Sequence, residues 1–81
     1  MPEIKIYHDV FRDAWRGSFT KDGKNYVADL VVVPDHHCPE VMIFRANSRG
    51  EIISWGGVYE GFPDSVNKES LIRHIEIFLS D

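Results

Sequence analysis

The chain of 81 residues has a single cysteine, Cys38, and no long apolar run. One cysteine excludes an internal disulfide and a four-cysteine zinc site, and an unpaired thiol is typical of a reducing compartment. Spanning a bilayer takes roughly 20 consecutive apolar residues, which the sequence does not provide. The first residues also lack the basic-then-apolar order of a secretory signal. We therefore expect a cytosolic protein.

Positive charge is scarce. The sequence has nine Lys and Arg residues against 13 Asp and Glu residues, which gives a net charge of −4. Between Arg49 and Lys68 there is no Lys or Arg, whereas Glu51, Glu60 and Asp64 fall in that interval. Proteins that bind nucleic acid usually carry a basic face. We therefore expect an acidic surface and no direct binding to nucleic acid.

Signatures of catalysis are missing as well. Gly56-Gly57 is followed by Val58 and Tyr59, not by the Lys and Ser or Thr that end a phosphate-binding loop. Nothing around Cys38 matches a cysteine nucleophile with its base, and a chain of this size has little room for a deep pocket. No repeat or linker divides the sequence. We expect one domain, residues 1–81, that is not an enzyme and holds no cofactor.

The pattern that is present begins with strands. Asp22-Gly23 between segments 14–20 and 25–33 is typical of a tight hairpin turn. Residues 30–33 are all apolar and predict a central strand covered on both faces. Segments 41–46 and 51–59 predict a second hairpin, in which Gly56-Gly57 marks a bulge or the close approach of another backbone.

The last segment has the pattern of a helix. Asn67 is a good N-cap, and Val66 and Leu71 are spaced as a hydrophobic staple. One apolar stripe is formed by Leu71, Ile72, Ile75, Phe78 and Leu79, while Arg73, His74 and Glu76 are expected to face water. The sequence thus predicts an α+β fold, an antiparallel β-meander of about five strands with a C-terminal α-helix packed on one face.

The loop of residues 35–40 joins two predicted strands and is rich in possible ligands. It contains His36, His37 and Cys38, flanked by Asp35 and Glu40. Zinc is bound by three or four such side chains in a tetrahedral arrangement. One hypothesis is therefore a metal- or ligand-binding domain centred on this loop, and the alternative is a solvated connection.

A different alternative is binding of single-stranded nucleic acid through the hairpin of residues 12–26. Basic and aromatic residues are interleaved there: Arg12, Arg16, Lys21 and Lys24 among Phe11, Trp15, Phe19 and Tyr26. Aromatic stacking combined with phosphate contacts is how such strands are held. Asp13 and Asp22 within this hairpin, with Asp9 and Asp29 just outside it, would repel phosphates, which argues against this alternative.

The acidic, aromatic segment 51–64 carries the leading functional pattern. Its candidate partner-binding residues are Glu51, Trp55, Tyr59, Glu60, Phe62 and Asp64. Trp and Tyr often anchor interfaces, and carboxylates favour a basic partner. Trp55 and Tyr59 lie four residues apart, so in a regular strand they would instead share a core face.

These observations favour a small acidic cytosolic protein-binding domain. Our leading hypothesis is an inhibitor that occupies a basic surface of a nucleic-acid-handling protein, of the anti-defence type that phages and mobile elements encode. The partner is then another protein. Because an antiparallel sheet has open edges, a homodimer that pairs two such edges is a further expectation.

Overall fold

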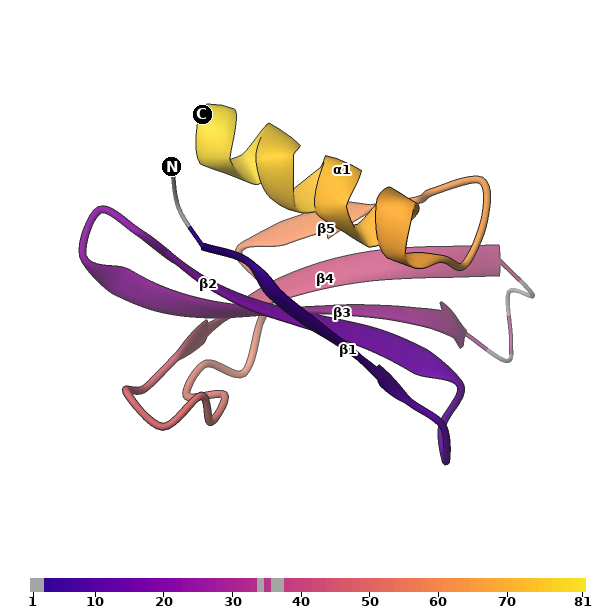
Figure 1. The fold of residues 1–81 in the computed structure, drawn as a ribbon, viewed down its shortest axis with the longest axis horizontal. Coiled ribbons are helices and arrows are strands. Elements are labelled where there is room, and N and C mark those ends of the chain that lie inside the picture. Colours follow the sequence, from indigo (N-terminus) through magenta and orange to yellow (C-terminus); the bar gives the residue numbers. More distant parts are fainter. Residues whose placement is uncertain (1–2, 34, 36–37) are drawn as a thin grey trace.

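The computed structural model describes residues 3–33, 35 and 38–81. Its elements are β1 (Lys5–Asp9), β2 (Ala14–Lys21), β3 (Lys24–Val33), β4 (Cys38–Ala46), β5 (Tyr59–Gly61) and α1 (Lys68–Ser80). Each strand pairs antiparallel with the next, so the order in the sheet is β1-β2-β3-β4-β5. The helix lies across one face of this sheet (Figure 1). The predicted α+β meander with a C-terminal helix is confirmed.

The β2–β3 hairpin closes through the turn that the sequence indicates. Lys21 and Lys24 are the last paired residues, and Asp22 and Gly23 between them have φ values of 52° and 77°. Two successive residues with positive φ match the right-handed twist of the flanking strands. Glycine has no steric penalty at such angles, and aspartate tolerates them. The turn therefore fixes the register of the hairpin locally.

The helix begins at the predicted cap. Asn67 has extended backbone angles, and its Oδ1 accepts a hydrogen bond of 2.8 Å from Ser70 N. The other end is held from the sheet, because Lys21 Nζ donates to Phe78 O at 2.7 Å and lies 4.5 Å from the centre of the Phe78 ring. A cation at this position complements the negative end of the helix dipole. In the described part of the chain, no helix is long and apolar enough to cross a membrane.

The core lies between α1 and one face of the sheet. The buried residues that form it are Phe19, Tyr26, Ala28, Leu30, Val41, Ile43, Leu71 and Ile75. Gly17 lies beneath the helix, where a Cβ would come within 2.8 Å of Ile6 Cδ1 and 2.9 Å of Ile75 Cδ1. The missing side chain therefore lets β1 and α1 close over the middle of β2.

The opposite face of the sheet has no helix. We call it the helix-free face, and the side chains of Tyr7, Arg16, Asp29, Met42 and Glu60 lie on it in one row across the five strands. The expectation that residues 30–33 are covered on both faces is wrong. Leu30 is fully buried against the core, but Val31 is half-buried and Val32 is 47% exposed. The reason is that α1 covers only one face of the sheet. Along β3, Leu30 is the last residue that packs in the core.

Replacing Leu71 by alanine tests the contact between helix and sheet. Leu71 is fully buried, so we expect Leu71→Ala to lower the free energy of unfolding by about 2–5 kcal/mol through lost burial and a cavity. Ile77 on the same helix is exposed, and Ile77→Ala should cost less than about 1 kcal/mol. Urea titrations followed by circular dichroism measure both values. Equal losses in the two variants would contradict this packing.

Candidate functional site

The sheet edge beyond β4 departs from the predicted strand 51–59. Ala46 lies opposite Ile52 in an isolated bridge, and continuing that antiparallel register would place residue 55 opposite Ile43. The residue opposite Ile43 is instead Tyr59. The chain therefore carries four extra residues between these pairs, because 59 exceeds 55 by four. The prediction of one continuous strand is wrong, and the regular part of this edge is β5, residues Tyr59–Gly61.

Hydrogen bonds hold these extra residues against β4. Ile53 N donates to Arg45 O at 2.9 Å, and Val58 N donates to Ile43 O at 2.7 Å. Between them, Ser54 Oγ accepts from Arg45 N at 3.2 Å and donates to Gly56 O at 3.1 Å. A side chain thus replaces a backbone partner where the strand leaves the sheet. We call residues 52–58 the edge segment.

Gly57 returns the edge segment to the sheet. A Cβ at this position would lie 2.7 Å from Met42 Cε and 3.3 Å from Ile43 O. A real Cβ does not approach a carbonyl oxygen and a methyl group this closely without displacing them. The close approach that the Gly56-Gly57 pair predicts is thus found at Gly57, and the edge segment has a defined conformation.

The edge segment exposes large apolar side chains. Trp55 is as accessible as in an isolated residue, with a relative exposure of 104%, and Ile52, Ile53 and Val58 are also exposed. Four exposed large apolar side chains within seven residues are more than a single scattered residue and make this segment a candidate interaction site. The sequence pattern identified Trp55 but missed Ile53 and Val58. The signal that could have found them is Ser54 together with Gly56-Gly57, which interrupts the strand pattern on both sides of Trp55.

Tyr59 points the other way, toward the helix. Its hydroxyl lies 2.6 Å from His74 Nδ1, and its ring meets the Phe78 ring edge-on with 6.2 Å between centres. Burial raises the pKa of Tyr59 above its ordinary value, and burial lowers the pKa of His74. The expectation that His74 faces water is wrong, because its imidazole is half-buried against β5. Gly61 lies beneath that imidazole, where a Cβ would be 2.5 Å from Nδ1.

The six predicted partner-binding residues are distributed over separate places. Glu51 and Trp55 lie at one end of β4, and Glu51 is 4.0 Å from Arg49. Glu60 lies on the helix-free face opposite Met42. Phe62 and Asp64 are exposed in the loop before α1, at the other end of β4 (Figure 1). The structure therefore does not gather the six residues at one place.

The 35–40 loop lies partly outside the described residues, because His36 and His37 do. Cys38 begins β4 and is half-buried. Within residues 3–33, 35 and 38–81, no three His, Cys, Asp or Glu side chains are grouped so that they could hold a metal ion. The metal hypothesis for His36, His37 and Cys38 stays a prediction.

Three of the four basic residues in the 12–26 hairpin make contacts within the protein, each at a different place. Arg16 makes two hydrogen bonds to Asp29, of 2.6 and 2.9 Å, and this contact raises the pKa of Arg16. Arg12 Nε donates to Asp9 at 3.0 Å, while Lys21 is bound to the end of α1 on the other face. The aromatic rings of Phe19 and Tyr26 are buried in the core. The hairpin therefore does not gather its cations and aromatic rings on one surface.

The helix-free face is hollowed at one end. A groove of about 440 Å³ runs between β1 and the turn 47–50. Its polar lining includes Lys5, Ser18, Thr20, Asn25, Asn47 and Arg49. Its lining also includes Ala46, which pairs with Ile52 of the edge segment. The groove is therefore a polar concavity next to the start of the edge segment.

The burial of His74 makes stability depend on pH. The pKa of His74 is lowered in the folded protein from its ordinary value of 6.5. Near pH 6.5 the unfolded chain therefore binds a proton at His74 more readily than the folded chain does. The free energy of unfolding should therefore fall as the pH drops through 6.5. In His74→Gln the fall between about pH 7.5 and 5.5 should be smaller. Urea midpoints at both pH values measure it, and identical pH dependence in the two proteins would contradict the assignment.

The relation of this chain to known proteins was tested by three comparisons. No family model, no curated protein and no solved structure matches it. The functional interpretation therefore depends on the geometry and charge of its own residues.

Proposed function

We propose that this chain is a non-enzymatic protein-binding domain that uses the edge segment as its contact surface. The observation that carries the proposal is Trp55, which is fully exposed on a segment held by hydrogen bonds from Arg45, Ser54 and Val58. Trp is the residue type most enriched among energetically dominant interface residues. A preformed backbone lowers the entropy lost on binding, so this arrangement favours recognition.

The charge of the surface supports a basic partner. The sequence has no Lys or Arg between Arg49 and Lys68, and Glu51 and Glu60 flank the edge segment as exposed carboxylates. Complementary charge accelerates encounter and selects against acidic surfaces. Proteins that handle nucleic acid present basic surfaces of this kind. We propose such a protein as the partner, with this chain acting as an inhibitor that covers the basic surface, as an anti-defence protein would.

The shifted titratable groups support binding over catalysis. The pKa of Asp9 is lowered by its hydrogen bond from Arg12, and the pKa of Arg16 is raised by Asp29. Tyr59 and His74 are shifted by burial between β5 and α1. Each of these groups has a structural partner in the fold. Their perturbation is therefore explained by folding contacts and does not call for a reaction.

Substitution of Trp55 tests the proposal. We expect Trp55→Ala to reduce capture of the partner from the native host by at least about tenfold, because a central aromatic anchor contributes about 2 kcal/mol or more. Glu60→Lys should also reduce capture through charge repulsion. The measurement is affinity purification with the tagged full chain, followed by quantitative mass spectrometry of the captured proteins.

Ile77→Ala is the matched control, because Ile77 is an exposed apolar residue on α1. It should capture the same proteins as the wild type. The melting temperature of all three variants should stay close to that of the wild type, since each altered side chain is exposed. Undiminished capture by Trp55→Ala would refute the edge segment as the contact surface.

A further inference from the structure

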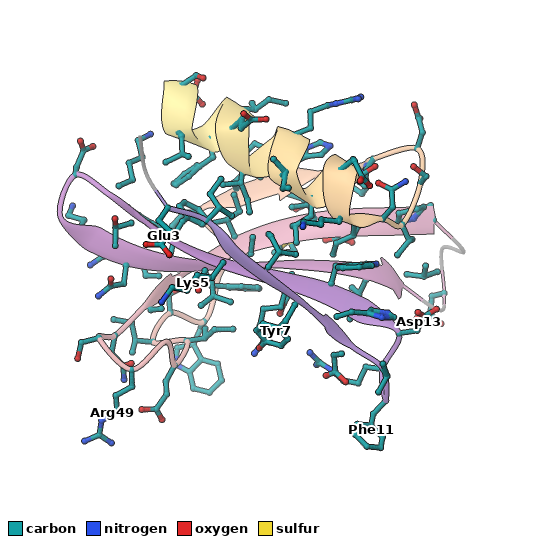
Figure 2. The ribbon with its side chains drawn as sticks, in the orientation of Figure 1. Glu3, Lys5, Tyr7, Phe11, Asp13 and Arg49 are labelled. Atoms are coloured by element: carbon teal, nitrogen blue, oxygen red, sulfur yellow. The ribbon has the colours of Figure 1, made fainter. Side chains whose placement is uncertain are left out.

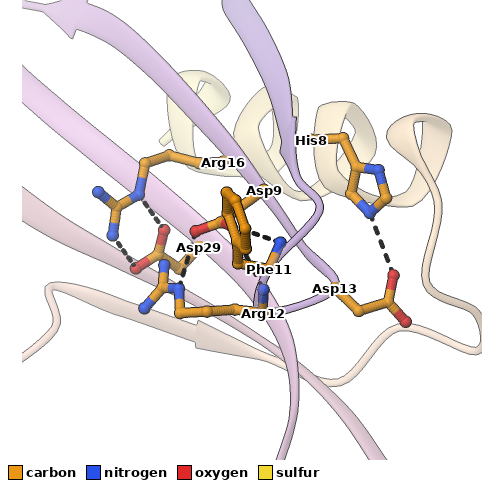
Figure 3. Close-up of polar contacts among 7 residues, drawn as sticks. All are labelled: His8, Asp9, Phe11, Arg12, Asp13, Arg16 and Asp29. Carbon is orange, nitrogen blue, oxygen red and sulfur yellow. Dashed lines mark hydrogen bonds and ion pairs between the residues drawn. The ribbon is translucent and has the colours of Figure 1, made fainter.

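The turn between β1 and β2 presents a second exposed aromatic side chain on a preformed backbone. The Asp9 carboxylate accepts hydrogen bonds from Phe11 N at 3.0 Å, Arg12 N at 3.3 Å and Arg12 Nε at 3.0 Å (Figure 3). These bonds satisfy the backbone of the turn and lower the pKa of Asp9. At the tip, Phe11 is 96% exposed and Val10 is exposed beside it. The turn therefore displays two apolar side chains without burying either.

A second contact holds the other end of this turn. His8 Nε2 lies 3.1 Å from Asp13 Oδ1, and the His8 ring stacks on Trp15 with 4.5 Å between centres. Asp13 has a φ of 49°, a left-handed angle that aspartate tolerates. Hydrogen bonds and stacking thus maintain a turn whose tip points into solvent. A preformed apolar tip is the arrangement that favours insertion into another protein.

The turn and the edge segment project from the same side of the molecule. In Figure 1 both the β1–β2 turn and residues 47–57 extend away from α1. The side chains of Tyr7, Phe11 and Arg49 point to that side in Figure 2. The helix-free face lies between the two projections, with Tyr7 half exposed near its middle and the groove at one end. The surface therefore has two raised apolar ends and a lower polar centre.

The charge of this face is negative because its ion pairs cancel and its unpaired carboxylates outnumber its unpaired amine. Arg16 is paired with Asp29 and Arg12 with Asp9. Among the described residues, no ion pair involves Lys5, Glu40 or Glu60, and none involves Glu3. Three carboxylates and one amine thus remain on the face, since alternate residues of β1, β4 and β5 share it. A second copy of this acidic face would be repelled, whereas a basic segment would be attracted.

We propose that one basic segment of the partner lies across the helix-free face and packs apolar side chains against Phe11 at one end and Trp55 at the other. This inference rests on the proposed function and identifies how the partner is held. Both anchors lie on connections between strands of one sheet, Phe11 in the β1–β2 turn and Trp55 in the edge segment before β5, so contact at both ends requires no change of fold. The carboxylates Glu40 and Glu60 then meet Lys or Arg side chains of the segment between the anchors.

A peptide-display selection tests this arrangement without knowledge of the natural partner. The probe is a library of random 20-residue peptides, selected on the immobilised full chain. We expect the enriched peptides to carry net positive charge and apolar residues at both ends. Phe11→Ala and Trp55→Ala should each weaken their binding by about tenfold or more, and Ile77→Ala should not. Binding should also weaken with salt.

The outcomes separate this inference from the proposed function. Peptides that depend on Trp55 but bind Phe11→Ala as tightly as the wild type would overturn the bridging segment and leave the edge segment as the contact surface. Enrichment of acidic peptides, or of none, would overturn the inference. Peptides indifferent to both substitutions, together with unchanged host capture by Trp55→Ala, would overturn both proposals. A dimer in sedimentation that Phe11→Ala and Trp55→Ala dissociate would assign the face to a second copy and also overturn the inference.

Discussion

The hydrogen bond between Tyr59 and His74, 2.6 Å long, joins β5 to α1 at the sheet edge that carries the exposed surface. Tyr59 fills the place opposite Ile43 on the helix side of the sheet, and Gly61 leaves room for the His74 ring beneath it. One aromatic side chain occupies this place, so the residues before Tyr59 must leave the strand. Trp55, which a regular register would put opposite Ile43, is therefore fully exposed. Packing at one aromatic residue thus determines the exposure of another.

Most of the Lys and Arg side chains in the first half of the sheet are bound to groups within the protein. Arg16 and Arg12 pair with Asp29 and Asp9, and Lys21 closes the end of α1. The partly buried pair of Arg16 and Asp29 has two short, parallel hydrogen bonds, the geometry in which such pairs are strongest. Each ion pair neutralises one carboxylate as well as one cation, so the charge of the helix-free face is set by its unpaired residues, among which the carboxylates Glu3, Glu40 and Glu60 outnumber Lys5. This is the physical basis for expecting a basic partner.

A chain of this length forms two layers, one sheet and one helix, and cannot cover both faces of the sheet. The uncovered face is bordered by two segments whose apolar tips, Phe11 and Trp55, are supported by hydrogen bonds at their bases. Unsupported tips would lose more conformational entropy on binding. The fold therefore combines a small core on the helix side of the sheet with the proposed contact surface on the opposite face.

Features that depend on residues close together in the chain could be predicted from the sequence alone. The turn at Asp22-Gly23, the cap at Asn67 and the apolar stripe with Leu71 and Ile75 follow from backbone angles and spacing within a few positions. These features predicted the meander and its helix. The tertiary structure decided which of Trp55 and Tyr59 is packed, because that choice depends on His74, which lies 15 residues beyond Tyr59. It likewise decided that Lys21 holds the helix, since its acceptor is 57 residues away. Local patterns carry no information about such distant partners, so the surface that remains exposed could be predicted only in part.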